Sequence, residues 1–499
     1  MLASVRSAVL QGVDGQVVTV EVHVTRGLPG YTVVGLPDTA GRESRERVRA
    51  ALLSSDIEFP MKRITVNLAP AALRKSGSGL ELAVAMALTC ANEELPAGVL
   101  DDMALLGELG LDGRVRPVLG TLALVDALVA AGTTRVVVPE TNAAEAALVP
   151  GAQVLVARRL GELRACLKGE ADWPEIPPAP PDDPAAAEDE PLELADVRGL
   201  PLARHALAAA AAGNHHLLML GPPGAGKTML ARRLATILPP LEASEALEVT
   251  KIHSAAGAAP RSGLCSVRPF RAPHHSASAV ALIGGGSPRP RPGEITLAHR
   301  GALFLDELGE FPPTVLDALR QPLEERVVRI SRAWGTVEFP ADFLLVACCN
   351  PCPCGRVEAD CRCSDTQRHR YLRRLSAPLL DRFDLRLEVT SADADAPAGE
   401  SSADVRERVA MAVERQRVRL DLTPWRRNAH VPAGALAEYL PLVGAAERTW
   451  RAVCRSRRLT GRGAARIRRL AWTLADLDER SPATEHDVEL AALLRGDVR

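Results

Sequence analysis

The chain has 499 residues, with 60 lysines and arginines against 62 aspartates and glutamates. This length predicts about three domains, and the nearly balanced charge excludes a protein whose whole surface attracts nucleic acid or anionic lipid. Ten cysteines in so long a chain do not suit a small disulfide-bonded secreted protein, and no stretch approaches the roughly twenty apolar residues of a membrane span. We expect a cytoplasmic protein with no membrane partner.

Strand-like and helix-like patterns alternate in the first part of the chain. Apolar and polar residues alternate over 17–24 and 64–68, which predicts strands, and helical patterns cover 42–53 and 80–91. We therefore expect residues 1–170 to form one α/β domain.

A linker and a second α/β domain follow. Residues 171–196 are rich in proline, alanine and acidic side chains, a composition typical of an extended linker. Within 197–395, three apolar runs end in polar residues, which is the pattern of a parallel sheet with its site at the carboxyl ends of the strands. These runs cover 216–220, 302–306 and 343–349.

Helical patterns dominate the last part of the chain. They cover 404–417, 433–439 and 464–477. We expect a helical C-terminal domain over 396–499, so the fold class of the whole chain is α/β with a helical C-terminal region.

A glycine-rich loop follows the first apolar run. It reads GPPGAGKT over 221–228 and leads into an apolar, helix-like segment. A strand that enters a helix through such a loop directs backbone N–H groups and the positive end of the helix dipole at a phosphate. The alternative is a glycine turn before an ordinary helix. The residues expected to bind a nucleotide, with a hydroxyl for Mg²⁺ at the end, are Gly221, Pro222, Pro223, Gly224, Ala225, Gly226, Lys227 and Thr228.

Polar residues end the other two apolar runs. Residues 302–308 read ALFLDEL, in which Asp306 is placed to hold Mg²⁺ and Glu307 to polarise an attacking water. Asn350 follows the next run and can orient that water, with a turn cap as the alternative. A D–E pair is a weak signal alone, but after a phosphate loop it predicts hydrolysis.

Two arginines are candidates for contacting a phosphate. Arg382, in LLDRFD, is a candidate arginine finger that reaches the γ-phosphate of a neighbouring subunit. Its alternative is an ion pair with Asp381 or Asp384. Arg466, in LTGRGAARIRRL, is a second phosphate-sensing candidate, and its alternative is a solvated basic helix face.

Four cysteines are crowded between the third apolar run and Arg382. In an extended segment, residues i and i+2 face the same way, so each CxC pair can present two thiolates together. Four thiolates suit a closed tetrahedral zinc site, and free thiols are the alternative. The cysteines are Cys352, Cys354, Cys361 and Cys363.

These parts, in this order, resemble an AAA+ ATPase, with Walker A at 221–228, Walker B at 303–307, sensor 1 at Asn350, the arginine finger at Arg382 and sensor 2 at Arg466. The intervening segments RPFRAPHHSASAVALIGGG and PGEITLAHRGALFLDELGEF resemble the magnesium-chelatase-like ComM/YifB family. This resemblance implies an insert in helix 2, near 284–294, and a hairpin before sensor 1, near 327–339.

The resemblance extends to the N-terminal domain. GLPGYTVVGLPDTAGRESRERVRAAL and RITVNLAPAALRKSGSGLELAVAMAL match the Lon-protease-like domain of the family. A Lon-like peptidase needs a serine activated by a lysine. Ser76 and Ser78 lie in the right region, but Leu122 stands where the lysine is expected, and no lysine lies between Lys75 and Lys168. We expect the fold without protease chemistry; Lys75 as the base is a remote alternative.

The resemblance implies a hexameric, ATP- and Mg²⁺-dependent motor that translocates on single-stranded or branched DNA and drives branch migration, helping incoming DNA to recombine during natural transformation. The alternatives are a chelatase-type ATPase that remodels a protein partner and a Lon-like ATP-dependent protease. A pore surface for DNA phosphates could include Arg289, Arg291, His299, Arg329, Arg332, Arg368, Arg370, Arg373 and Arg374, although several can equally be solvated or structural charges. Aromatic residues make up 3% of the chain, and only Trp334 lies in the hairpin, so base stacking is not the main mode of binding.

Overall fold

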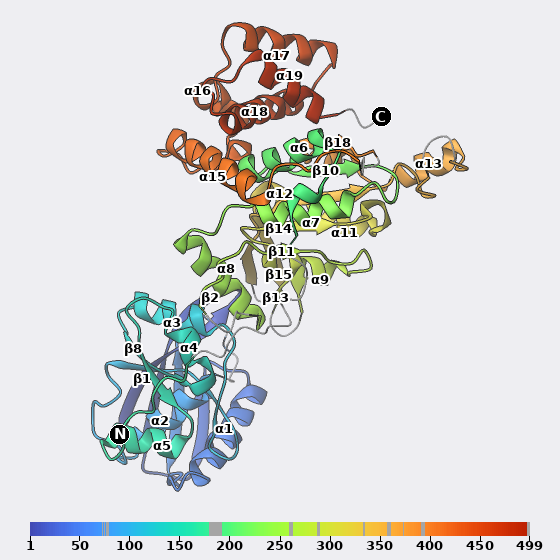
Figure 1. The fold of residues 1–499 in the computed structure, drawn as a ribbon. Helices are drawn as coiled ribbons and strands as arrows, with labels where there is room; N and C mark the ends of the chain where they lie inside the picture. The colour runs from blue at the N-terminus through green and yellow to red at the C-terminus, as the bar shows by residue number, and fades with distance from the viewer. Residues whose placement is uncertain are drawn as a thin grey trace. The chain divides into compact units, whose positions relative to one another are not determined.

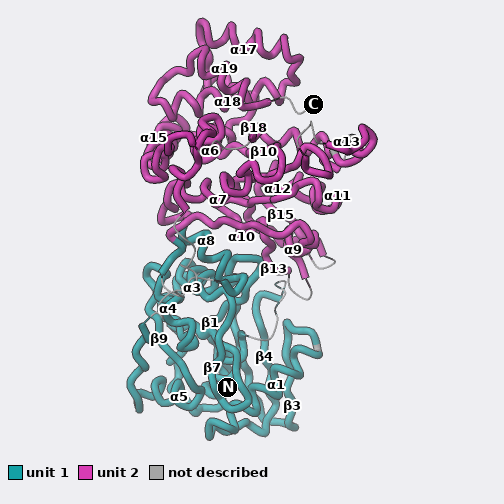
Figure 2. Tube along the Cα trace, turned by 45° about the vertical axis from the view of Figure 1, so that its right-hand side comes forward, with its two compact units in different colours: residues 1–187, 246–265 teal, residues 188–245, 266–499 magenta. Residues whose placement is uncertain are grey.

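The computed structural model describes the chain except for residues 72, 74, 76–78, 179–191, 259–262, 287–289, 333–334, 357–360, 373, 391–394 and 497–499. Its residues form two compact units, coloured separately in Figure 2. Unit 1 contains Met1–Ala187 and Ala246–Cys265, and unit 2 contains Glu188–Glu245 and Ser266–Arg499. Half of the expected linker, residues 179–191, lies outside the described residues. The order of the chain alone does not reveal that residues 246–265 group with unit 1.

Unit 1 is built on a mixed seven-stranded sheet of order β3-β4-β2-β1-β5-β8-β9. Its antiparallel centre pairs β1 with β2, in the register Val5↔Val20, and β2 with β4. The other neighbours are parallel. The strands are β1 (Leu2–Gln11), β2 (Asp14–Thr25), β3 (Gly30–Val34), β4 (Arg63–Ala69), β5 (Met103–Leu105), β8 (Arg135–Pro139) and β9 (Gln153–Ala157).

Helices cover this sheet, as Figure 1 shows. Helix α2 (Glu81–Ala91) is buried along almost its whole length because it packs on β1 and β2 while α1 (Asp38–Leu53) packs against it. The strands and helices expected from the sequence in this part are confirmed. The remaining elements are the short pair β6 (Glu108–Leu109) and β7 (Val115–Arg116), α3 (Thr121–Ala130), α4 (Ala143–Ala146), α5 (Leu160–Lys168) and α8 (Ala243–Ala256), most of which lies in unit 1.

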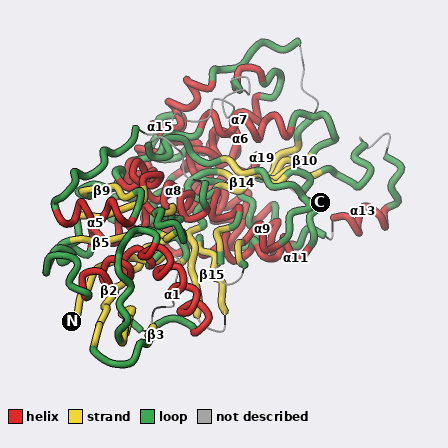
Figure 3. The backbone as a smooth tube through the Cα atoms, turned by 90° about the horizontal axis from the view of Figure 1, so that it is seen from below, coloured by secondary structure: helices red, strands yellow, loops and turns green. Residues whose placement is uncertain are grey.

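Unit 2 is built on a five-stranded, all-parallel sheet of order β11-β14-β17-β10-β18. Helices α6 (Pro201–Gly213) and α7 (Lys227–Ile237) pack on it (Figure 3). A parallel sheet is covered by helices, so its strands are continuous apolar runs, and this is why the sequence located them. The strands are β10 (Leu217–Leu220), β11 (Phe270–Arg271), β14 (Ala302–Leu305), β17 (Leu344–Cys349) and β18 (Leu385–Glu388).

Two insertions interrupt unit 2 where the resemblance placed them. The first contains α9 (Ala279–Ile283), the short pair β12 (Gly284–Gly285) and β13 (Arg291–Pro292), and α10 (Glu294–Leu297). The second is the hairpin of β15 (Val327–Arg332) and β16 (Gly335–Pro340), preceded by α11 (Pro313–Ala318) and α12 (Arg320–Glu325).

The C-terminal part of unit 2 is helical, as expected. No helix among the described residues is both long and apolar enough to cross a membrane. The helices after β17 are α13 (Asp365–Leu372), α14 (Ala377–Leu380), α15 (Ser402–Arg419), α16 (Leu436–Tyr439), α17 (Gly444–Ser456), α18 (Gly461–Leu477) and α19 (Glu485–Leu494).

A buried ion pair joins α15 to α18. Arg419 donates two hydrogen bonds to the Asp476 carboxylate, which is 1% exposed, and its guanidinium lies 4.5 Å from the ring centroid of Trp472. Asn428 donates a further hydrogen bond to the same carboxylate at 2.9 Å. Burial raises the pKa of Asp476, and the Arg419 charge opposes that shift.

Removing Arg419 leaves a buried carboxylate without its cation. We expect Arg419→Met to lower the free energy of unfolding of unit 2 by about 3 kcal/mol, measured by urea denaturation followed by tryptophan fluorescence. Arg417→Met is the matched control because Arg417 and its partner Glu414 are each more than half exposed, and such pairs contribute about 0–1 kcal/mol. Equal losses in the two variants would show that the buried pair does not stabilise the helical region.

Candidate nucleotide site

The glycine-rich loop occupies the turn between β10 and α7. Gly226 begins α7 from a left-handed conformation (φ 88°), and the backbone N–H of Gly221 donates to the carbonyl of Cys349 on β17. A methyl group on Gly221 would lie 2.3 Å from the carbonyl oxygen of Val389, so only glycine fits between the adjacent strand ends. The loop is thus clamped at the carboxyl edge of the sheet, with the N-terminus of α7 behind it.

Five of the expected side chains meet at this edge. Lys227 donates to the carbonyls of Gly221 and Pro222 at 2.7 and 2.8 Å and to Oδ1 of Asn350 at 3.1 Å. Thr228 Oγ1 donates to Asp306 Oδ2 at 2.8 Å. Asp306, Glu307 and Asn350, with the loop, line one cavity of about 360 Å³.

The chemistry of this donor set fits a magnesium nucleotide. A hydroxyl and a carboxylate 2.8 Å apart are hard oxygen ligands of the kind that Mg²⁺ selects. Burial lowers the pKa of Lys227, and its ammonium is satisfied by carbonyl and amide oxygens that a phosphate can replace. Lys227, Thr228 and Asp306 would hold the phosphates and the ion, and the bound ion would neutralise charge on the transferred phosphoryl group.

Glu307 has a partner that the sequence analysis missed. Its backbone is left-handed (φ 51°), and its carboxylate lies 3.3 Å from Nδ1 of His275, which follows β11. The signal available in the sequence was the polar run HHS at 274–276, which comes shortly after β11. The other predicted site residues likewise follow strands of the same sheet.

Arg382 and Arg466 lie together, but at the opposite edge of the sheet from the phosphate loop. Both line a cavity of about 260 Å³ with His216, which precedes β10, and Asp384, which precedes β18. The four-residue strand β10 separates the two edges by roughly 13 Å. The two predicted arginines therefore lie in the same cavity. That cavity is not the one at the phosphate loop of their own chain.

Carboxylates hold both arginines. Arg466 is 8% exposed and binds Asp381 at 2.9 Å and Asp384 at 2.8 Å, so the alternative of a solvated basic helix face does not hold. Arg382 pairs with Glu324 of α12 rather than with the two aspartates proposed as alternatives. Burial alone would raise the pKa of Asp384, but His215 and Arg466 hold it well below its usual range, so its negative charge persists.

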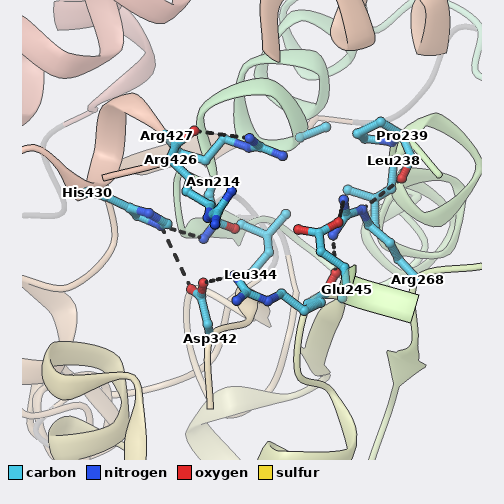
Figure 4. Close-up of a pocket in the computed structure, with 13 residues that line it drawn as sticks. Asn214, Leu238, Pro239, Glu245, Arg268, Asp342, Leu344, Arg426, Arg427 and His430 are labelled. Carbon is cyan, nitrogen blue, oxygen red and sulfur yellow. Dashed lines mark hydrogen bonds and ion pairs between the residues drawn. The ribbon is translucent and has the colours of Figure 1, made fainter. Parts of the chain in front are cut away.

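A second hollow at the amino edge is filled by its own polar groups. Figure 4 shows His430 directed at Asp342, with 3.8 Å between Nε2 and Oδ1, and Asn214 within 3.1 Å of the same ring nitrogen. Arg268 binds Glu245 at 2.6 Å on the other side. Burial lowers the pKa of His430 to about 3. These groups satisfy one another, so we read this hollow as structural.

The four crowded cysteines form a compact cluster. Their sulfur atoms all lie within 4.8 Å of one another, and Cys352 is 3.3 Å from Cys354 and 3.5 Å from Cys361. Sulfurs bound to one tetrahedral zinc ion, each at about 2.3 Å, are roughly 3.8 Å apart. A hydrogen bond from the backbone of Arg356 lowers the pKa of Cys354 to about 6, whereas burial raises that of Cys352 to about 12. The four thiols could therefore hold a metal ion.

The thiol cluster lies against the nucleotide site. Gly355 has φ 70°, and a methyl group there would lie 2.7 Å from Cγ of Pro223 in the phosphate loop and 3.8 Å from Nδ2 of Asn350. Cys352 follows Asn350 by two residues and is 3% exposed. The loop that carries the thiols thus supports both the phosphate loop and Asn350.

Unit 1 shows why leucine is tolerated where a catalytic lysine was considered. Leu122 is fully buried in an apolar cluster. Lys75 is buried, and its ammonium donates to the carbonyls of Pro70 and Leu73 while burial lowers its pKa. Ser76 and Ser78 lie outside the described residues.

Most of the arginines considered for DNA binding are already engaged or not described. His299 is 3% exposed, and its Nδ1 accepts from the backbone N–H of Asp342, so it belongs to the core. Arg329 is paired with Glu325 and Glu338, and Arg374 with Glu310. Among the others, Arg291, Arg332 and Arg370 are exposed, while Arg289, Arg373, Trp334 and the side chain of Arg368 lie outside the described residues.

Comparison with known proteins agrees with this fold. Three family models match the chain: "Subunit ChlI of Mg-chelatase" over 20–142, "Magnesium chelatase, subunit ChlI" over 193–396, and "Magnesium chelatase, subunit ChlI C-terminal" over 399–495. The middle match contains the phosphate loop, Asp306, Glu307 and the thiol cluster, and together the three matches cover most of the chain.

Relatives resemble nearly the whole chain. YifB of Escherichia coli is 40% identical over 500 residues, covering 99% of this chain and 97% of YifB. The competence protein ComM of Haemophilus influenzae is 44% identical over 417 residues, covering 82% of this chain and 81% of ComM. Lon protease 2 of Bacillus subtilis is 28% identical over 187 residues, 33% of this chain and 34% of the protease. The chain belongs to the magnesium-chelatase-like ComM/YifB family of AAA+ proteins.

Proposed function

We propose that this protein hydrolyses ATP in a hexameric ring and uses the energy to translocate on single-stranded or branched DNA and drive branch migration. The observation that carries the ATPase proposal is the convergence of Lys227, Thr228, Asp306, Glu307 and Asn350 on one cavity. Lys227 binds the β- and γ-phosphates, Thr228 and Asp306 hold Mg²⁺, Glu307 accepts the proton of the attacking water, and Asn350 orients that water.

The proposal of a ring is supported by the positions of the expected residues at the two edges of the parallel sheet. Arg382 and Arg466 line a cavity at the amino edge of the sheet, and the length of β10, roughly 13 Å, separates that edge from the phosphate loop of the same chain. A neighbouring subunit could place the amino edge of its sheet against the phosphate-loop cavity of this chain. It would then supply both guanidinium groups. We therefore propose that Arg382 is the arginine finger, that Arg466 is a second phosphate contact, and that hydrolysis requires the assembled ring.

The DNA proposal rests on kinship and on the insertions. A relative at 44% identity is named as a competence protein, which supports a role in recombination of incoming DNA. The exposed Arg291 and Arg332 lie in the two insertions, where they can neutralise backbone phosphates without reading bases. All ten cysteines are free of disulfide bonds, which supports placement in the reducing cytoplasm.

The central test measures ATP turnover with and without forked DNA, together with displacement of a labelled strand. We expect the DNA to stimulate turnover in the wild type, Lys227→Ala to lose ATP binding, and Glu307→Gln to bind ATP but hydrolyse it at least about 100-fold more slowly. Turnover that ignores DNA, with no strand displaced, would favour a chelatase-type ATPase that remodels a protein partner.

Arg382 gives a separate test of the ring. Arg382→Ala should bind ATP as the wild type does but hydrolyse it about 1,000-fold more slowly, because the guanidinium that stabilises the negative charge of the transition state is lost while the phosphate loop is intact. Mixing it with Lys227→Ala should restore turnover at the interfaces where an intact Arg382 faces an intact phosphate loop. Loss of ATP binding in Arg382→Ala would instead assign the arginine a structural role.

We also propose that the ion held by the four thiols is zinc, and that it braces the nucleotide site. Four thiolates are the ligand set of closed structural zinc sites, and the intervening Gly355 backbone packs on Pro223 beside Asn350. A bound ion would fix this loop, and through it the lysine–asparagine hydrogen bond at 3.1 Å.

Metal analysis should find about one zinc ion per chain. The double variant Cys354→Ser and Cys361→Ser should release the zinc ion and lower ATP turnover. Cys454→Ser, outside the cluster, should keep the zinc ion and the wild-type turnover. Metal-free protein with normal turnover and normal thermal stability would remove the zinc proposal without affecting the ATPase.

A further inference from the structure

The outer face of helix α17 carries a row of arginines. Figure 1 shows α17 at the outside of the C-terminal helices, where it packs against α19 and α18. Ala446 and Trp450 lie on the packed face of the helix, among the residues of the core. Arg448, Arg451 and Arg455 recur three and four residues apart on the opposite face, and all three are exposed. The row therefore faces solvent.

A fourth arginine extends this row beyond the end of α17. The backbone N–H of Arg458 donates to the carbonyl of Arg455 at 3.2 Å, and Arg458 is exposed. We call Arg448, Arg451, Arg455 and Arg458 the arginine row. The seven residues from Arg448 to Arg455 rise roughly 10 Å along the helix axis, which corresponds to about three steps between phosphates along one strand of duplex DNA.

The positive charge of the arginine row is largely uncompensated. Glu447 is the only acidic residue of α17, and its carboxylate is shared between Arg451 at 2.8 Å and Arg468 of α18 at 2.9 Å. The other three arginines of the row form no ion pair with the residues that the structure describes. A row of exposed guanidinium groups with one shared carboxylate attracts a polyanion.

The surroundings of the arginine row favour nucleic acid over an acidic protein. Within 443–493, all of which the structure describes, the exposed large apolar side chains are Val443 and Leu493, one at each end. A protein interface has an apolar core, whereas interfaces with DNA are polar and strongly positive. Trp450 Nε1 donates to the carbonyl of Ala464, and Trp472 is 3% exposed, so neither ring is free to stack on a base. The row is suited to phosphates, which guanidinium groups bind through paired hydrogen bonds.

We propose that the arginine row is a contact for the phosphate backbone of DNA, separate from the two insertions. The inference rests on the proposed DNA translocase and adds a binding surface in its helical C-terminal region. Contacts to phosphates do not read bases, so the row holds DNA of any sequence. Each phosphate that it neutralises releases counterions, and the row therefore adds to the salt dependence of DNA binding.

The test measures the affinity of the full-length protein for a labelled single strand by fluorescence anisotropy, over a series of salt concentrations without ATP. We expect the double variant Arg448→Gln and Arg455→Gln to lower the slope of log K against log salt concentration by about 1.4, because each phosphate contact to a single strand contributes about 0.7. The matched control, Arg406→Gln and Arg417→Gln, removes two exposed arginines from α15 and should keep the wild-type slope.

The double variant Arg448→Lys and Arg455→Lys separates charge from folding, because it keeps both positive charges and should retain the wild-type slope. An unchanged slope in the glutamine double variant would overturn the inference and leave the row to an acidic protein partner. An equal fall in the α15 control would also overturn it. Loss of the wild-type assembly on gel filtration, in the glutamine double variant alone, would instead assign the row to a contact between subunits.

The same measurements distinguish failure of the arginine row from failure of the proposed function. A wild type that binds no DNA would remove the DNA translocase and the arginine row together. A wild type that binds DNA, with a glutamine double variant of the same affinity and slope, would remove the row alone. ATP turnover without DNA should be the same in all these variants, because the row lies outside the nucleotide site.

Discussion

The arrangement of functional residues in unit 2 depends on the common direction of the strands in its parallel sheet. All five strands run the same way, so everything that follows a strand lies at one edge and everything that precedes a strand lies at the other. The phosphate loop, Asp306 and Asn350 follow β10, β14 and β17, whereas Asp384 and Arg382 precede β18. The phosphate loop and the two arginines are thereby kept at opposite edges of the sheet within one chain.

Ion pairs determine how firmly Arg466 and Arg382 are held at the amino edge of the sheet. Arg466 is fixed by Asp381 and Asp384, and His215 supports that charge from behind with its Nδ1 3.3 Å from Asp384. A guanidinium fixed by two carboxylates keeps its direction at little entropic cost. Arg382 has only Glu324, which is half exposed, so it exchanges partners more easily. Arg466 is thus held in one direction by two carboxylates, whereas Arg382 is held by a single half-exposed partner.

The sequence predicted those parts whose signal is local. Strand β17 is an apolar run because both its faces are covered. The loop at 221–228 needs glycine at 221, where a methyl group would lie 2.3 Å from the carbonyl oxygen of Val389. Parts that depend on long-range packing could not be predicted. His299 looks like a surface base but is buried, Arg329 looks free but faces two glutamates, and residues 246–265 join unit 1 although unit 2 flanks them in the chain.

Sheet order also explains which residues flank Glu307 at the end of β14. The strand lies between β11 and β17, so Glu307 is flanked by His275 on one side and Asn350 on the other. Asn350 accepts a hydrogen bond from Lys227 and lies beside Gly355 of the thiol loop. These contacts restrict its movement. His275 belongs instead to a segment that runs directly into an insertion. The two residues beside Glu307 therefore belong to segments of different surroundings, one packed on the phosphate loop and the other leading to α9.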